Sequence, residues 1–230
     1  MWSAPYGLAP NGIVSTGIGA LKMDQVFTYR VIQGSLTRLS LSLPTVNVTQ
    51  VRGDDIQDWR IENAKLLVTL SRPREDVYRL QVLSEMSLPK FPTRFTLPVI
   101  VPENVIRTSG FLMIGTDSAI KLQVPKIAGL TQMDSAAFVA GDTGVVGDVK
   151  RLVPTRPAAA YQFANMPYTA EVAADDVTPA LNADCRHVLT LAENELSFSA
   201  SIELDIRDAP AREVLLETLA DPGWTVTGVT

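Results

Sequence analysis

The sequence predicts an all-β fold, built from an antiparallel β-sandwich module or modules with little helix. Three observations support this. Apolar and polar residues alternate with a period of two along most of the chain. The alternating runs are about four to eight residues long, the usual length of a strand. Turn-forming residues separate the runs at intervals of about ten residues, which is typical of sandwiches and barrels.

The strands are expected in a regular order along the chain. Residues 12–19 contain glycines without the spacing of a phosphate-binding loop, so they are expected to form a flexible entry segment. The strongest alternation follows at residues 21–31. Pro98 places its own run at a sheet edge or a bulge, because proline cannot donate to a central ladder. Further strands are expected at residues 36–43, 46–51, 66–71, 77–83, 95–101, 111–114, 120–124, 158–163 and 168–172.

Helical features are confined to two segments. Apolar residues at helical spacing predict one or two turns within residues 130–139. Residues 209–220 favour helix by propensity, with Pro210 at a good first-turn position. They also fit alternation, and their counterpart at residues 36–43 is strand-like, so a strand is predicted there. Residues 140–157 are expected to form a long connection.

A repeat indicates how the chain is divided. The alternation at residues 21–31 recurs 175 positions later, at residues 196–206. We therefore expect a β-sandwich module at residues 1–187, followed at residues 188–230 by the opening strands of a second, truncated copy. The alternative is that residues 188–230 complete the first sandwich.

The composition narrows the classes of function. The net charge is −5, and 46% of the residues are apolar and 20% charged, as in an ordinary folded domain. No basic block is present, so nucleic acid is not an expected partner. No 18-residue apolar run is present, so membrane insertion of this segment is not expected. Cys185 is the single cysteine, which excludes an intrachain disulfide.

No residues are predicted to form a catalytic, cofactor or metal site, and no cofactor is expected. Cys185 and His187 would share one face of a strand, but a lone pair of this kind is usually a packing or surface feature. Asp54, Asp55 and Asp58 supply the oxygen ligands that Ca²⁺ prefers, without the EF-hand spacing, so a solvated turn is expected. Two other groups of aspartates are weaker candidates for a Ca²⁺ site: Asp175 and Asp176 with Asp184, and Asp142 with Asp148.

Two further kinds of site are not predicted. Nothing singles out a pair of carboxylates for glycoside hydrolysis. A carbohydrate-stacking face would need exposed aromatic residues, whereas core positions are expected for Trp59 and Trp224. The aromatic residues available for such a face are Trp2, Tyr6, Trp59, Tyr161, Phe163, Tyr168 and Trp224.

One resemblance rests on the strand pattern. Residues 27–59 read as an alternating strand, a turn, a strand ending at Leu43 and Pro44, a short strand and an acidic turn before Trp59. Residues 66–82 complete the pattern. This resembles the repeated β modules of very large, uncharacterised bacterial envelope proteins. The resemblance implies a β-sandwich module in an extracytoplasmic setting, either the cell envelope or secreted, and it implies no site residues.

The function expected from the sequence is a non-catalytic structural or protein-interaction β module of a larger multi-domain protein. Its expected partners are neighbouring domains of that protein or another protein. Absence of enzyme activity is the favoured expectation. Two alternatives stay open: a carbohydrate- or ligand-binding β-sandwich, and an accessory domain of a β-rich hydrolase.

Overall fold

The computed structural model describes residues 6–141, 151, 153–177, 179–209, 211, 213–216 and 225–229, with the backbone alone for residues 139–141. The described residues form seventeen strands and one short helix, which confirms the all-β class. The chain divides into two compact units, Met1–Asp176 and Val177–Thr230. The expected boundary at residue 187 falls inside a strand of the second unit.

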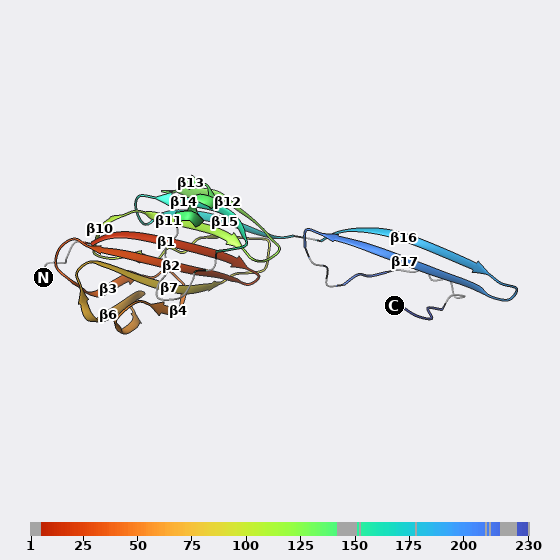
Figure 1. Cartoon of the computed structure of the whole chain (residues 1–230), viewed down its shortest axis with the longest axis horizontal. Helices are drawn as coiled ribbons and strands as arrows, with labels where there is room; N and C mark the ends of the chain where they lie inside the picture. Colours follow the sequence, from red (N-terminus) through yellow and green to blue (C-terminus); the bar gives the residue numbers. More distant parts are fainter. Residues whose placement is uncertain are drawn as a thin grey trace. The chain divides into compact units, whose positions relative to one another are not determined.

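The first unit is organised around one large sheet, here called the central sheet (Figure 1). Its strand order is β13-β14-β11-β1-β2-β7-β4, and β10 also pairs with β1. β1 pairs in parallel with β10 and β11, and antiparallel with β2. The strands are β1 (Tyr6–Gly17), β2 (Ala20–Val31), β4 (Asn47–Arg52), β7 (Val77–Ser87), β10 (Val105–Thr108), β11 (Gly110–Thr116), β13 (Thr131–Met133) and β14 (Arg156–Phe163).

Two smaller sheets complete the first unit. The β6 sheet has the order β5-β6-β3-β9, and the β15 sheet has the order β12-β15-β8. The β6 sheet comprises β3 (Leu36–Ser42), β5 (Ile56–Glu62), β6 (Lys65–Arg74) and β9 (Val101–Pro102). The β15 sheet comprises β8 (Thr93–Thr96), β12 (Ile120–Ala128) and β15 (Thr169–Asp176).

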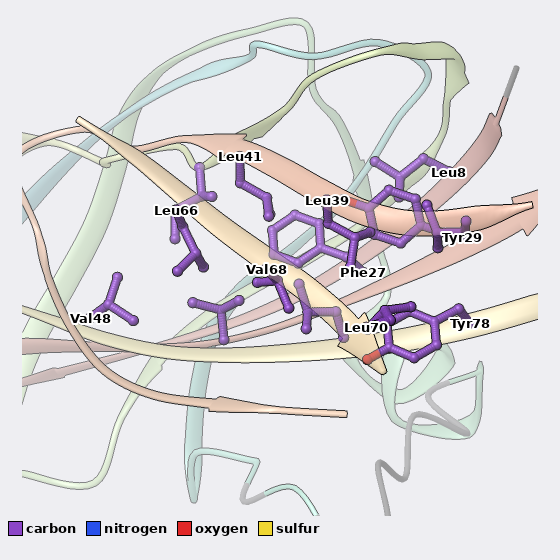
Figure 2. Close-up of a cluster of buried hydrophobic side chains, with 14 of the residues drawn as sticks. Leu8, Phe27, Tyr29, Leu39, Leu41, Val48, Leu66, Val68, Leu70 and Tyr78 are labelled. Carbon is purple, nitrogen blue, oxygen red and sulfur yellow. The ribbon is translucent and has the colours of Figure 1, made fainter. Parts of the chain in front are cut away.

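The core fills the space between the central sheet and the two smaller sheets. Figure 2 shows Phe27 and Tyr29 of β2 lying among the leucines and valines of β3 and β6. A second cluster packs Leu21 and Met23, from the other half of the same face of β2, against Val172 of β15. One face of the β1–β2 hairpin is therefore buried along its length by both small sheets. Each fully buried leucine of this kind contributes about 2 kcal/mol.

The opposite face of the central sheet is partly covered by the helix α1 (Ser135–Gly141). Phe138 of α1 packs against Ile13 of β1 and Met113 of β11, and all three are buried. Asp134 caps the helix by accepting a hydrogen bond from the backbone N–H of Ala136 at 2.8 Å. No helix among the described residues has the length and apolar character needed to cross a membrane.

The described residues of the second unit form one antiparallel hairpin, made by β16 (Ala180–Leu191) and β17 (Leu196–Arg207) (Figure 1). Residues 213–216 and 225–229 have no strand or helix. The strand expected over residues 209–220 is thus absent from residues 213–216. The rest of that expectation, apart from residues 209 and 211, lies outside the described residues.

Three other expectations need correction. Residues 12–19 belong to β1 and its turn rather than to a flexible entry segment. The strand expected at residues 95–101 is instead two strands in different sheets, β8 and β9, separated at Pro98. The acidic turn before Trp59 is shorter than expected, because β5 already begins at Ile56. The helix expected within residues 130–139 is confirmed from Ser135 onward.

Candidate functional site

The acidic group at Asp54, Asp55 and Asp58 pairs with arginines instead of forming a cation site. Arg74 Nη2 lies 2.6 Å from Asp55 Oδ2 and 3.8 Å from Asp54 Oδ2. Asp58 faces Arg60, with the nearest N–O distance 3.7 Å. Among the described residues, no three His, Cys, Asp or Glu side chains could hold a metal ion together. The role of Arg74 is therefore to fix the turn that precedes β5.

The other acidic candidates are not brought together either. Asp175 lies opposite Lys121 in the ladder between β12 and β15. Asp184 belongs to the second unit, where it lies opposite Glu203 in the hairpin. Asp142 and Asp148 lie outside the described residues.

The aromatic residues do not form an exposed row. Tyr161, Phe163 and Tyr168 are buried in the core next to the β15 sheet, and burial raises the pKa of the Tyr168 hydroxyl. Trp59 is 37% exposed on the edge strand β5, so the core position expected for it is wrong. Tyr6 is half-buried and meets Tyr29 edge to face. Trp2 and Trp224 lie outside the described residues. A carbohydrate-stacking face therefore has no support from the described aromatic residues.

Cys185 and His187 do share one face of β16, but their surroundings are apolar. Directly across the ladder, Cys185 faces Ile202 and His187 faces Ala200. The His187 ring meets Phe198 edge to face, with ring centroids 5.3 Å apart. With apolar neighbours in place of carboxylates, the pair has no partner for metal binding or nucleophilic chemistry in the described part of the second unit.

The apolar surface around these two residues is the most distinctive feature of the second unit. Residues paired directly across an antiparallel ladder point to the same face. The register of β16 and β17 therefore places twelve side chains on one face, here called the hairpin face. Its members are Leu181, Ala183, Cys185, His187, Leu189, Leu191, Leu196, Phe198, Ala200, Ile202, Leu204 and Ile206.

This face is largely open to solvent. Leu189 is 62% exposed, Leu191 81% and Phe198 51%. The other side of the hairpin carries mostly polar and charged residues, among them Asp184, Arg186, Thr190, Ser199 and Glu203. The hairpin is therefore amphipathic, with the composition of a strand pair that has one side in a core and one in water.

The hairpin has the same pairing register as β1–β2 in the first unit. Tyr6 pairs with Val31 and Thr16 with Leu21. Adding 175 to each number gives Leu181 with Ile206 and Leu191 with Leu196, and both are observed pairs. Every pair between these limits follows the same rule. The turns match as well, because Gly17 pairs with Ala20 and Ala192 donates a backbone hydrogen bond to Glu195 at 2.8 Å.

The corresponding face of β1–β2 is covered in the first unit, with only the end pair Tyr6 and Val31 half-buried. The side chains equivalent to the hairpin face include Leu8, Val14, Leu21 and Phe27, all of them buried. Strands β3 and β6 cover one half of that face, and β15 covers the other. The outer edges are paired too: β7 pairs antiparallel with β2, and β11 pairs in parallel with β1.

Sequence reasoning found only half of this element. The alternation of β17 was recognised, whereas β16 was missed because Ala183, Cys185 and His187 are weakly apolar and interrupt its pattern. Comparing residues 181–191 with residues 6–16 at the same offset of 175 would have revealed the pairing.

A second feature lies on the outer face of the central sheet. A hollow of about 610 Å³ opens over β2, β4 and β7. Beside it, the Asp24 carboxylate accepts a hydrogen bond from Gln81 Nε2 at 2.9 Å and lies 3.3 Å from Arg151 Nε. Arg151 also donates to the backbone carbonyls of Asn11 and Asp24. These polar groups bind one another, so the cluster holds Arg151 against β1 and β2.

Asp117 lies at the rim of the same hollow. The backbone N–H of Thr155 donates to its carboxylate at 2.8 Å, and the hydroxyls of Thr155 and Ser15 donate as well. These hydrogen bonds, led by the backbone N–H, lower the pKa of Asp117. Asp117 thereby links the turn after β11 to the start of β14.

Comparison with known proteins identifies no family. No protein-family model matches the chain, and no curated protein matches it.

The solved structures that match include a zinc metallopeptidase, at low identity. The M1 zinc metallopeptidase from Deinococcus radiodurans matches with 13% identity and a TM-score of 0.43, over 86% of this chain and 47% of that one. A point mutant of that metallopeptidase with bound Tyr-Ser-Ala substrate gives 12% identity and a TM-score of 0.44 over the same shares. This chain spans about half the length of the solved structures that it matches. The activity of those proteins is not transferred to it.

Proposed function

We propose that this chain is a structural or protein-interaction β module of a larger multi-domain protein, and that the hairpin face of β16–β17 is its interaction element. We further propose that the module works outside the cytoplasm. The resemblance of residues 27–82 to envelope β modules supports that setting.

The observation that carries the proposal is a row of twelve aligned side chains on one face of a hairpin, ten of them aliphatic, aromatic or alanine; eleven of the twelve are exposed, and Ile202 is half-buried. A contiguous apolar surface of this kind is typical of a binding site on a soluble protein. A two-stranded hairpin is also marginally stable by itself, so further strands or a partner are needed to hold it. The opposite side is polar apart from Ala180 and Val188, so the apolar residues are concentrated on one face.

The repeat gives the second line of support. The same register in β1–β2 and β16–β17 is the arrangement expected of two tandem modules. We therefore propose that β16–β17 opens a second module, as β1–β2 opens the first.

The proposal is tested by charging the hairpin face in the full chain. In the variant Leu189→Lys/Ile202→Lys, both new charges lie on the hairpin face. In the matched control Thr190→Lys/Ser201→Lys, they lie on the polar side. The wild type and the control should bind the dye 8-anilinonaphthalene-1-sulfonate, and the face variant should lose most of that fluorescence. Equal fluorescence from all three proteins would mean that the hairpin face is not available for binding.

A further inference from the structure

The geometry points to one occupant for the hairpin face. We propose that β16–β17 takes up a further copy of the strands formed by residues 36–176 of this chain, and completes a second sandwich with them. This inference rests on the proposed function, because it names the partner of the same surface. The proposed occupant is a set of β strands that cover the hairpin face and also pair with the two outer edges of the hairpin.

One cross-strand pair has the same combination of a large and a small side chain in both hairpins. In β1–β2, Gly12 lies opposite Gln25, and a Cβ added to Gly12 would sit 3.8 Å from Gln25 Cγ. At the equivalent positions of the second hairpin, His187 lies opposite Ala200. The large and the small residue have exchanged strands, while the pair as a whole keeps a similar volume. Such an exchange is expected where both hairpins face the same kind of packed interior.

An apolar residue also recurs at one position on the opposite side of both hairpins. In β1–β2 that side carries Ile13, which packs under Phe138 of α1. The equivalent residue of β16 is Val188, which is a large apolar residue on a mostly polar side and is 53% exposed. The complement that would cover Val188 is a counterpart of α1, which belongs to the same 36–176 segment.

The outer edges of the two hairpins differ in whether they pair with further strands. In the first unit, the outer edges of β1 and β2 are paired with β11 and β7. In the two-stranded sheet of the second unit, the corresponding edges of β16 and β17 have no strand partner among the described residues. Unpaired edges next to an apolar face favour the addition of strands.

The area of the face argues against a second hairpin as the occupant. Twelve-residue strands give a ribbon about 40 Å long and about 10 Å wide. Two such faces packed together would bury about 800 Å², below the roughly 1,200 Å² of a stable interface. They would also leave all four outer edges unpaired. A set of strands that pairs with both outer edges and also covers the hairpin face would bury the apolar side chains and satisfy the edge hydrogen bonds.

The test supplies the complement directly. Since residue 209 corresponds to residue 34, a fusion protein replaces residues 210–230 with a second copy of residues 35–176. The backbone amides of β16–β17 should then exchange with deuterium as slowly as those of β1–β2, on the order of 100-fold more slowly than in the unmodified chain. Dye fluorescence should fall to the level of the face variant. Unchanged exchange in β16–β17, beside an appended copy that stays unfolded, would overturn the inference.

A matched pair of variants controls the fusion. Leu189→Lys/Ile202→Lys within the fusion should abolish protection of β16–β17 and leave the first unit intact. Thr190→Lys/Ser201→Lys should keep that protection. If the unmodified chain binds dye through the hairpin face but the fusion does not fold, the interaction element stands and the occupant is wrong. If light scattering shows that the unmodified chain dimerises with a protected hairpin, the occupant is a second copy of that hairpin, and the inference is also overturned.

A double-mutant cycle in the first unit tests the shared interior without a fusion. Gly12→His alone should lower the urea midpoint of unfolding, because the ring enters a packed space near Leu112. Gln25→Ala alone should lower it by leaving a cavity. The double variant copies the pair found at His187 and Ala200, and it should be more stable than Gly12→His alone. A double variant no more stable than that single variant would contradict a common interior for the two hairpins.

Discussion

Arg151 and Asp24 form a buried ion pair on the outer face of the central sheet, with Nε and Oδ2 3.3 Å apart. The Arg151 side chain is 3% exposed and that of Asp24 is 19% exposed. Arg151 also donates to the backbone carbonyls of Asn11 and Asp24, so its guanidinium binds two neighbouring strands. This one side chain ties residue 151 to both strands of the first hairpin of the chain.

Removing Arg151 should therefore destabilise the first unit substantially. Arg151→Ala leaves a mostly buried carboxylate without its cation, which typically costs about 3–5 kcal/mol. Urea unfolding followed by circular dichroism should show this loss as a lower midpoint.

The matched control is an exposed ion pair in the same unit. Arg60 contacts Glu62 at 2.6 Å, but both side chains are more than half exposed. Arg60→Ala should cost less than about 1 kcal/mol, because solvent screens the pair. If both variants lost similar stability, burial would not be the reason for the strength of the Arg151 pair.

Gly110 lies close against the backbone of β1. A Cβ added there would lie 1.9 Å from the carbonyl oxygen of Pro10, so β1 and β11 would have to separate. We expect Gly110→Ala to cost about 3 kcal/mol or to prevent folding. Gly7→Ala is the control, because the nearest atom to its Cβ would be 3.9 Å away. Equal urea midpoints for the two variants would contradict this assignment.

Removing the hydroxyl of Tyr29 and removing that of Tyr78 should change the stability of the first unit differently. The Tyr29 hydroxyl is buried and has no hydrogen-bond partner in the described part of the chain. Tyr29→Phe should leave stability unchanged or raise it by about 1 kcal/mol. The Tyr78 hydroxyl donates to the carbonyl of Asp54 at 3.0 Å, so Tyr78→Phe should cost about 1 kcal/mol. Thermal denaturation of both variants measures the difference, and a loss in Tyr29→Phe would reveal an unseen partner.

Alternation was sufficient to predict the fold class but not the assignment of strands to sheets. The runs containing Phe27, Leu66 and Leu80 predicted strands because each alternates cleanly on one buried face. The segment around Pro98 could not be resolved this way, since strands β8 and β9 join different sheets although they are close in sequence. Sheet membership depends on contacts between residues far apart in the chain, which a local pattern does not encode.

The candidate site was predictable only in part for a related reason. The repeat identified β17 but not its partner β16, whose middle residues are Cys185, Arg186 and His187. Cys185 and His187 are exposed, and their neighbours across the ladder are apolar. The ion pair of Arg151 had no local signal, because its partner Asp24 lies 127 residues away.

The acid stability of the first unit should depend on Asp117. The backbone N–H of Thr155, with two hydroxyls, lowers its pKa below the ordinary value of 3.8. A lowered folded pKa means that the unfolded chain takes up the proton first as the pH falls. The stability from this group is therefore fully present above the unfolded value and is lost as the pH falls through the folded value.

Asp117→Asn should accordingly be less stable than the wild type at pH 7 and should lose less stability between about pH 5 and pH 3. Urea midpoints measured across this range test the slope. Asp184→Asn, in the other unit, should leave the acid dependence of the first unit unchanged. A wild-type slope retained in Asp117→Asn would assign the effect to other carboxylates, such as Glu103, whose hydrogen bond with Lys65 lowers its pKa as well.

Truncation before Ala183 distinguishes two modules from one continuous sandwich. The residues up to Asp176 form a compact unit in which three sheets enclose the core on both halves of β1–β2. A chain ending at Asp176 should therefore keep the circular dichroism spectrum and the urea midpoint of the first unit, because none of the core residues between the sheets is removed. The spectrum and urea midpoint of the truncated chain are compared with those of the full chain. The Gly110→Ala variant shows how a destabilised first unit behaves in the same measurements. An unfolded truncated protein would show that residues 177–230 complete the first sandwich, and that β16–β17 does not open a second one.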